Sequence, residues 1–264
     1  MQPLVRYPGG KHKSALRLAA YFDPSLPFLE PFAGGAAVTL AMRRRGCRSI
    51  TIGDLAVSVV NLWSWVRDDV ECLIEHLPAA LDVDLYRAAR RRLGYWTVQA
   101  AAAKVVVLRG SQGARGGGPI GGWQQNAPTY LINARWNFDS ICRSAREHSA
   151  ALQNVNILHM DGVQALRQWP DIPAFVDPPY VEKGHLLYAD SLDFNVLADV
   201  LRERSGDFVL TLDNPAPYAD WCTVEPSTTA GNGGRKAEFI ISRLTRPPVG
   251  DKFSTTTTTQ GGAI

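Results

Sequence analysis

The feature that most constrains the fold is an alternation of short apolar runs with helical stretches toward both ends of the chain. Such an alternation favours an α/β fold in which helices cover both faces of a mostly parallel sheet. We therefore expect a mostly parallel seven-stranded sheet. The expected strands are residues 27–32, 49–54, 155–161, 174–177, 208–213, 222–225 and 238–244, and the expected helices are residues 36–45, 57–66, 162–168 and 194–204.

Several of these strands end in an acidic residue. In open α/β sheets, ligands bind outside the carboxyl ends of the strands. We therefore expect three or four carboxylates to meet at one edge of the sheet. The acids are Asp54, Asp161, Asp177 and Asp213.

Composition excludes several classes of protein. The chain has 264 residues, of which 45% are hydrophobic and 20% are charged, as in a globular protein that is dissolved in water. No apolar run approaches the length of a membrane span, and the N-terminus has no apolar signal region, so we expect a cytoplasmic protein. The four cysteines and five histidines lack metal-ligand spacing, so no bound metal is expected.

Charge is distributed unevenly along the chain. Residues 86–138 contain eight basic residues and no acid, and the rest of the chain carries 20 bases against 25 acids. A segment of charge +8 in a body of charge −5 predicts an insert that binds a polyanion. We expect four parts: residues 1–65 and 151–246 form the catalytic domain, residues 66–150 form a helical, basic insert, and residues 247–264 form a tail.

The sequence Asp177-Pro178-Pro179-Tyr180 follows the apolar run 174–176. Proline fixes φ and has no N–H, so carbonyl groups at this strand end stay available as acceptors. The carboxylate, the free carbonyl and the aromatic ring of this motif suit a planar ligand ring with an exocyclic amino group. The ring would stack on Tyr180, while Asp177 and the Pro178 carbonyl accept the amino hydrogens. The alternative interpretation is a strand-terminating turn with a structural aspartate.

A loop of small residues, Glu30 to Ala37, joins the first expected strand to a helix. Small residues allow a ligand to approach the backbone, and a helix N-terminus offers N–H groups. Asp54, twenty residues after Gly34, suits the hydroxyl groups of a ribose. The loop has neither of the two glycine patterns that bind phosphates, G-x-G-x-x-G and G-x-x-x-x-G-K-[ST], so an adenosine without phosphates is favoured over a nucleotide. The alternative interpretation is a tight turn that binds no ligand.

Near the N-terminus, Tyr7-Pro8-Gly9-Gly10-Lys11 precedes a short helical stretch. Two glycines before a lysine present backbone N–H groups and one cation, which could bind a ligand carboxylate. By itself, the Gly9-Gly10-Lys11 pattern is weak evidence of a binding site.

Four features resemble, in chain order, the motif series of the Dam-type (D12 class) DNA adenine N6-methyltransferases: Tyr7-x-Gly9-Gly10-Lys11, the loop from Glu30 to Gly35, Asp54, and Asp177-Pro178-Pro179-Tyr180. The resemblance covers residues 5–67 and 150–244 and implies a Rossmann-like fold with S-adenosylmethionine as the methyl donor. The family loop often reads F-x-G-x-G, and here Ala36 takes the place of the last glycine. The implied cofactor residues are Tyr7, Gly9, Gly10 and Lys11 at the methionine end, Phe32 and Gly34 beside the nucleoside, Asp54 at the ribose, Asp161 at the adenine edge and Asp177 between donor and acceptor.

The resemblance implies methylation of N6 of an adenine that is flipped out of double-stranded DNA by a monomeric, bacterial or phage-encoded cytoplasmic enzyme, with Asp177, Pro178, Pro179 and Tyr180 as its catalytic motif. Restriction-modification and phage protection are among the possible settings. The alternatives are methylation of the amino group of cytosine, of an RNA base or of a protein glutamine, and a non-catalytic nucleic-acid-binding module that keeps the cofactor fold. The DNA-binding candidates in the insert are Arg91, Arg109, Arg115, Trp123 and Arg135.

Overall fold

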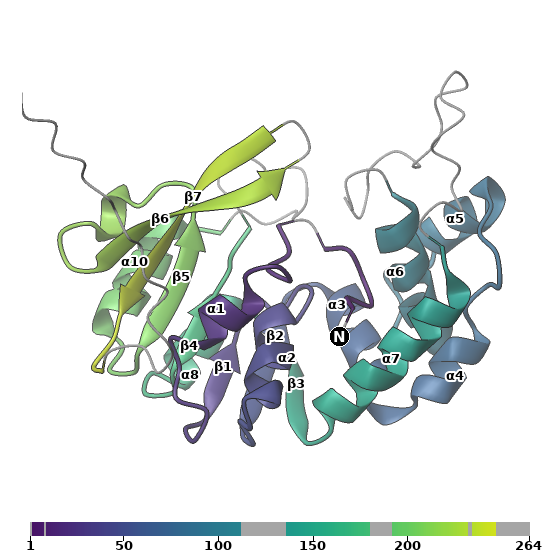
Figure 1. Cartoon of the computed structure of the whole chain (residues 1–264), viewed down its shortest axis with the longest axis horizontal. Helices are drawn as coiled ribbons and strands as arrows, with labels where there is room; N and C mark the ends of the chain where they lie inside the picture. The colour runs from purple at the N-terminus through teal and green to yellow at the C-terminus, as the bar shows by residue number, and fades with distance from the viewer. Residues whose placement is uncertain (1, 8, 112–135, 180–191, 232–233, 247–264) are drawn as a thin grey trace, which may run out of the picture.

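A seven-stranded sheet with strand order β3-β2-β1-β4-β5-β7-β6 forms the centre of the molecule (Figure 1). The computed structural model describes residues 2–7, 9–111, 136–179, 192–231 and 234–246. Within these residues the number of strands agrees with the sequence prediction. The strands are β1 (Phe28–Glu30), β2 (Ile50–Asp54), β3 (Val155–His159), β4 (Ala174–Val176), β5 (Phe208–Leu212), β6 (Thr223–Gly231) and β7 (Gly234–Arg243).

The sheet is mixed, so the prediction of a mostly parallel sheet is corrected. Strands β1 to β5 pair in parallel, whereas β7 runs antiparallel to both of its neighbours, β5 and β6. The reason is the connection: β6 and β7 are consecutive, with Gly231 paired to Gly234, and a hairpin can only be antiparallel. Their pairing also extends both strands beyond the apolar residues from which they were predicted.

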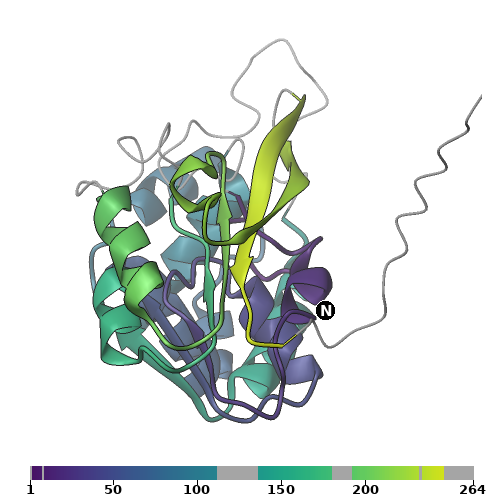
Figure 2. The same ribbon diagram turned by 90° about the vertical axis from the view of Figure 1, so that its left-hand side faces the viewer.

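Side chains alternate between the two faces of the sheet, and each face carries its own hydrophobic core. Phe28 and Phe175 pack in one core, whereas their neighbours Leu29 and Val176 pack in the other. In Figure 2, which views the molecule from the β6–β7 side, α1 (purple) and α10 (green) lie on opposite sides of the strands. The first core is covered by α1 (Ala15–Ala19), α2 (Ala37–Arg44) and α3 (Val57–Asp68), and the second by α8 (Gly162–Gln168), α10 (Phe194–Glu203) and the 3₁₀ turn η3 (Ala216–Tyr218).

Four helices form a group at the end of the molecule opposite the β6–β7 hairpin (Figure 1). Each begins at a side chain that accepts a backbone N–H of its first turn, an arrangement typical of helix starts. The capping residues are Asp69, Asp82, Thr97 and Asn137. The helices are α4 (Val70–Glu75), α5 (Val83–Arg90), α6 (Val98–Gly110) and α7 (Phe138–Leu152).

Helix α6 is the centre of this group, and it is buried on all sides. Its alanines and valines pack in the same core as α3, α7 and the sheet residues Ile52 and Val155. A helix that is apolar all round is a buried helix. The helical group therefore shares one continuous core with the sheet.

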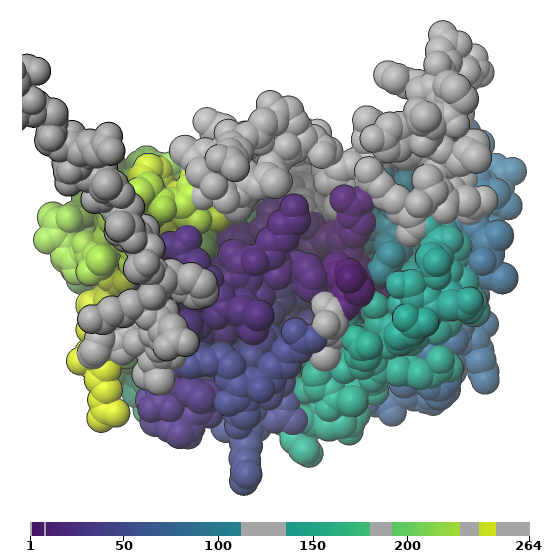
Figure 3. Space-filling model, in the orientation of Figure 1, coloured from purple at the N-terminus to yellow at the C-terminus, as the bar shows by residue number. Residues whose placement is uncertain are grey.

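The N-terminal segment crosses the face of the molecule shown in Figure 3, where it lies next to α7. Leu4 and Val5 are buried. Arg109, near the end of α6, donates from Nε to the Leu4 carbonyl at 2.7 Å and from Nη2 to the Pro3 carbonyl at 2.8 Å. These bonds hold the segment that leads to Tyr7 against the helical group.

Among the helices described, none combines the length and the apolar character that crossing a membrane requires.

Candidate active site

The chain order of the parallel strands reverses between β1 and β4, which are neighbours in the sheet. Such a switch point opens a crevice at the carboxyl ends of the two strands, where α/β proteins bind their ligands. Here the segments that leave the strands are the loop after Glu30 and the Asp177-Pro178-Pro179 sequence after Val176. The structure therefore brings two of the predicted motifs to the position where a ligand site is expected.

Asp177 is held in one orientation by two donors to the same oxygen. Its Oδ1 accepts a hydrogen bond from Lys11 Nζ at 2.7 Å and another from Thr211 Oγ1 at 2.6 Å. The side chain is 19% exposed. No donor to its Oδ2 is found in the described part of the chain, so this second oxygen can accept from a ligand.

Lys11 is a buried cation whose hydrogens are already directed at acceptors of the protein. Besides Asp177, its Nζ contacts Glu238 Oε1 at 3.1 Å and donates to the Gly9 carbonyl at 3.0 Å. An ammonium group has three hydrogens, and these three acceptors match them. Lys11 thus joins the N-terminal motif to β4 and β7. Sequence reasoning missed Glu238, which is a single acid in an otherwise apolar part of β7.

Glu30, at the end of β1, fills the N-terminus of α2. Its Oε2 accepts the Thr39 N–H at 2.8 Å, and the side chain is fully buried. Burial raises the pKa of Glu30 to about 8, and the nearby negative charge of Asp177 adds to this rise. Glu30 thus engages the N–H groups of Val38 and Thr39, which a phosphate could otherwise have used.

The raised pKa of Glu30 makes folding stability depend on pH. The native state keeps a proton that the unfolded chain releases above its pKa of 4.5, so this contribution is complete below pH 4.5 and is lost as the pH rises toward about 8. We expect the wild-type free energy of unfolding to fall by up to about 4 kcal/mol more than that of Glu30→Gln between pH 5 and pH 8. Urea unfolding at both pH values measures the difference, and Glu75→Gln on the exposed face of α4 is the control; equal pH profiles for wild type and Glu30→Gln would contradict the assignment.

The loop between β1 and α2 packs tightly under Tyr7. Gly34 has φ +42°, and a Cβ atom on it would lie 2.9 Å from the Tyr7 ring. Ala36, in the place of the second family glycine, has φ 50°. Its backbone thus takes the left-handed conformation that glycine adopts more easily, so the departure from the family pattern leaves the turn in a glycine-like geometry.

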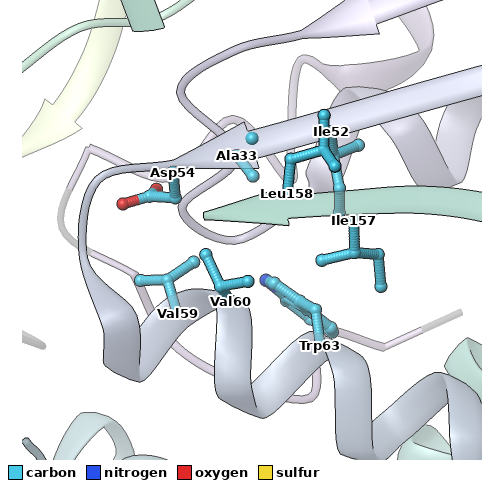
Figure 4. A pocket seen from close by; sticks show the side chains of 9 residues that line it. Ala33, Ile52, Asp54, Val59, Val60, Trp63, Ile157 and Leu158 are labelled. Atoms are coloured by element: carbon cyan, nitrogen blue, oxygen red, sulfur yellow. The ribbon is translucent and has the colours of Figure 1, made fainter. Parts of the chain in front are cut away.

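Asp54, at the end of β2, is buried and binds the same loop. Its Oδ2 accepts the Gly34 N–H at 2.9 Å, and its Oδ1 accepts the Ala56 N–H at 2.8 Å. Burial raises the pKa of its carboxyl group, and these hydrogen bonds oppose the rise. In Figure 4 the carboxylate points away from the apolar side chains below it, which include Val59 and Trp63. A carboxylate has further lone pairs, so Asp54 can still accept hydroxyl groups.

Phe32 and Asp161 lie together at the start of α8. Asp161 caps this helix by accepting the Gln164 N–H at 3.0 Å. A Cβ atom on the adjacent Gly162 would lie 2.4 Å from the Phe32 ring. The absence of a side chain at Gly162 therefore lets Phe32 lie against α8 beside Asp161.

Lys104, on α6, is a further side chain at this edge of the sheet. It is 7% exposed, and its Nζ donates to Ser58 Oγ at 2.9 Å and lies 5.9 Å from the centre of the Tyr7 ring. Burial lowers the pKa of Lys104 to about 8, and the charge of Asp54 opposes this shift. Sequence reasoning counted Lys104 only among the bases of the insert, because spacing within a helix that is apolar all round does not indicate which neighbour a residue meets.

The predicted DNA-binding residues differ in their exposure and in their contacts. Arg91, just after α5, is exposed, whereas Arg109 is engaged by two backbone carbonyls, which favours a structural role for it. Sequence reasoning missed Tyr95 and Trp96, which are 64% and 54% exposed between α5 and α6. The predicted residues that lie outside the described part of the chain are Arg115, Trp123, Arg135 and Tyr180.

The described side chains contain no group of three or more His, Cys, Asp or Glu residues that could hold a metal ion.

The fold is that of an α/β protein with a candidate ligand site at the switch point of its sheet. Residues 7–99 match the family model of the D12 class N6 adenine-specific DNA methyltransferases. That family is a family of enzymes that methylate adenine in DNA, and the matched residues include the loop after β1 and Asp54. The match confirms the resemblance over the first two motifs and Asp54, and the Asp177-Pro178-Pro179-Tyr180 sequence lies outside the matched residues. No curated protein matches the chain.

Proposed function

We propose that the chain transfers a methyl group from S-adenosylmethionine to N6 of an adenine that is flipped out of double-stranded DNA. The observation that carries this proposal is the state of Asp177. One of its oxygens is fixed by Lys11 and Thr211, and the other has no donor in the described residues, at the edge of the sheet where Asp54 also lies.

The chemistry of the side chains suits S-adenosylmethionine. This cofactor has hydroxyl groups, amino groups and a sulfonium charge but no phosphate, and the edge of the sheet offers carboxylates while Glu30 occupies the helix N-terminus. Asp54 would hold the ribose, Phe32 and Asp161 would flank the adenine, and Tyr7 with Gly34 would line the path to the methionine end. When bound, S-adenosylmethionine supplies an electrophilic methyl group on a positively charged sulfur.

Asp177 and the Pro178 carbonyl would accept the two hydrogens of the adenine amino group. The lone pair of this nitrogen is delocalised into the ring, and two acceptors localise it as positive charge develops on the nitrogen. Because Lys11 and Thr211 fix Asp177 before the substrate arrives, little reorganisation is needed. The proton released from the nitrogen can pass to water at the partly exposed carboxylate. Tyr180 would stack on the flipped base, and Pro179 would keep the segment rigid.

The direct test is the identity of the methylated base. The chain is incubated with duplex DNA and cofactor that carries a labelled methyl group, and the DNA is digested to nucleosides. We expect label in N6-methyl-2′-deoxyadenosine alone. Label in N4-methyl-2′-deoxycytidine would overturn the assignment of the base. Label only when RNA is supplied would overturn the assignment of the polymer, and no label would favour a binding module.

The exposed arginines beside α5 support a DNA contact. Arg90, Arg91 and Arg92 are exposed and are followed by the exposed Tyr95 and Trp96. Buried Asn61 donates to the Thr97 carbonyl at 2.8 Å and fixes the backbone next to these rings. A basic cluster next to exposed aromatic rings can contact phosphates and unstacked bases. We infer that this surface contacts DNA and that the enzyme acts as a monomer in the cytoplasm, where DNA is accessible.

Replacement of Arg91 by Gln should weaken DNA binding and lower its salt dependence. One phosphate contact contributes about one unit to the slope of log affinity against log salt, so the slope should fall by about one. Fluorescence anisotropy between low and moderate salt measures it. Arg48→Gln, at the exposed amino end of β2, removes the same charge at the opposite edge of the sheet and should leave the slope unchanged. Equal slopes for wild type and Arg91→Gln would exclude the contact.

A further inference from the structure

Lys104 is a buried cation that forms no ion pair within the described part of the chain. Only 7% of the residue is exposed, and no carboxylate in the described residues lies within ion-pair distance of its Nζ. A buried ammonium group is unfavourable unless acceptors compensate it. Of its three hydrogens, the described structure directs one to Ser58 Oγ at 2.9 Å. The remaining two are available to a ligand.

The position of this ammonium group is at the candidate ligand site. Ser58 is in the first turn of α3, directly after β2 and Asp54. The Tyr7 ring, 5.9 Å from Nζ, packs against Gly34 and Gly35 of the loop after β1. Lys104 thus reaches from the helical group to the carboxyl ends of β1 and β2.

Of the two described lysines at this edge of the sheet, Lys11 is ion-paired with carboxylates and Lys104 is not. Lys11 was the expected partner for the methionine end, yet its ammonium is held by Asp177, Glu238 and the Gly9 carbonyl. The carboxylates Asp54 and Asp161 at this edge would repel a carboxylate ligand, and the ring of His159, at the end of β3, contacts the Leu55 carbonyl at 2.9 Å. An amino-acid carboxylate brought here needs a donor with a positive charge, and Lys104 has both the charge and the hydrogens.

We propose that Lys104 binds the cofactor, and that its ammonium group donates to the amino-acid carboxylate of S-adenosylmethionine. The proposal rests on the proposed function, because it takes S-adenosylmethionine as the ligand. It gives the helical group a direct part in cofactor binding, in addition to the DNA contact assigned to it.

The test compares two ligands that differ in the carboxylate. S-adenosylhomocysteine carries the amino-acid end, and 5′-methylthioadenosine lacks it while keeping the adenosine. Calorimetry of the full chain measures both ligands with wild type and Lys104→Met. We expect Lys104→Met to raise the dissociation constant of S-adenosylhomocysteine about 10–100-fold, as for a lost hydrogen bond between charged groups. The dissociation constant of methylthioadenosine should stay within about threefold of its wild-type value.

Each outcome decides the proposal. Equal weakening of both ligands would overturn it and place Lys104 at the ribose with Asp54, and no weakening of either would also overturn it. A wild-type chain that binds neither ligand would instead refute the proposed cofactor, so the two failures are distinguishable. Thermal unfolding checks that Lys104→Met is folded, and Lys104→Arg, which keeps the charge, should retain part of the preference for S-adenosylhomocysteine even if Lys104→Met does not fold. Arg48→Gln, at the opposite edge of the sheet, is the control for loss of a positive charge.

Discussion

Replacement of Asp177 by Asn is expected to lower the rate of methyl transfer by about 10²–10³-fold, because the acceptor that stabilises developing charge is lost. An asparagine can turn its carbonyl oxygen toward Lys11 and Thr211, and it then presents an NH₂ group where the adenine amino group needs an acceptor. The loss should appear in kcat and equally in kcat/KM for DNA, as for an interaction made mainly in the transition state. Single-turnover transfer of labelled methyl groups measures it.

Two further variants distinguish the role of Asp177 as an acceptor from the role of the hydrogen bonds that orient it. Thr211→Val removes the 2.6 Å hydrogen bond to Oδ1 and should reduce the rate less than Asp177→Asn, because Lys11 still holds the carboxylate. Asp207→Asn, at the amino end of β5, should act like wild type, since it makes the same chemical change at the opposite edge of the sheet. Methyl transfer by Asp177→Asn at the wild-type rate would refute the proposed role.

The second large effect concerns the folded state. Lys11→Met leaves Asp177 and the 4%-exposed Glu238 side chain without the cation that lies 2.7 and 3.1 Å from their oxygens. Breaking a buried ion pair by removing one partner costs about 3–5 kcal/mol, because the remaining charge stays buried and unpaired. We expect a loss of this size in the free energy of unfolding, measured by urea denaturation at pH 7.

The partner variants make this prediction specific. Lys13→Met removes an exposed lysine two residues away and should change stability little. Adding Glu238→Gln to Lys11→Met removes one of the unpaired charges and should recover part of the loss. A double variant that is less stable than Lys11→Met would show that the unpaired Glu238 carboxylate is not a cause of the destabilisation in Lys11→Met.

Much of the fold could be predicted because local signals agree with it. Apolar runs that end in an acid or a proline marked β2 and β4, and an acid at the end of a parallel strand must lie at the carboxyl edge of the sheet. The sequence alone therefore places Asp54 and Asp177 at the same edge. The direction of β7 could not be predicted, because it depends on a hairpin whose polar residues give no strand signal.

The site could be predicted less completely, because burial decides the state of its charges. Lys11 has the sequence context of an open anion site, and only the packing of β7 brings Glu238 to it. Glu30 was part of a loop motif, and its full burial and its bond to Thr39 depend on how α2 lies against β1. The sequence analysis included Lys104 only among the basic residues of the insert, while its role depends on its contact with Ser58 of α3.

The continuous core beneath α3, α6 and α7 has a consequence for engineering. A recognition module that only touched its neighbour could be exchanged between enzymes to change the DNA sequence that is methylated. Here a transplant of the four helices would expose the apolar surface of the sheet and would remove the N-terminal anchor that Arg109 provides. On the proposed DNA contact, new sequence preference is therefore better sought by altering side chains between α5 and α6 in place than by recombining whole segments.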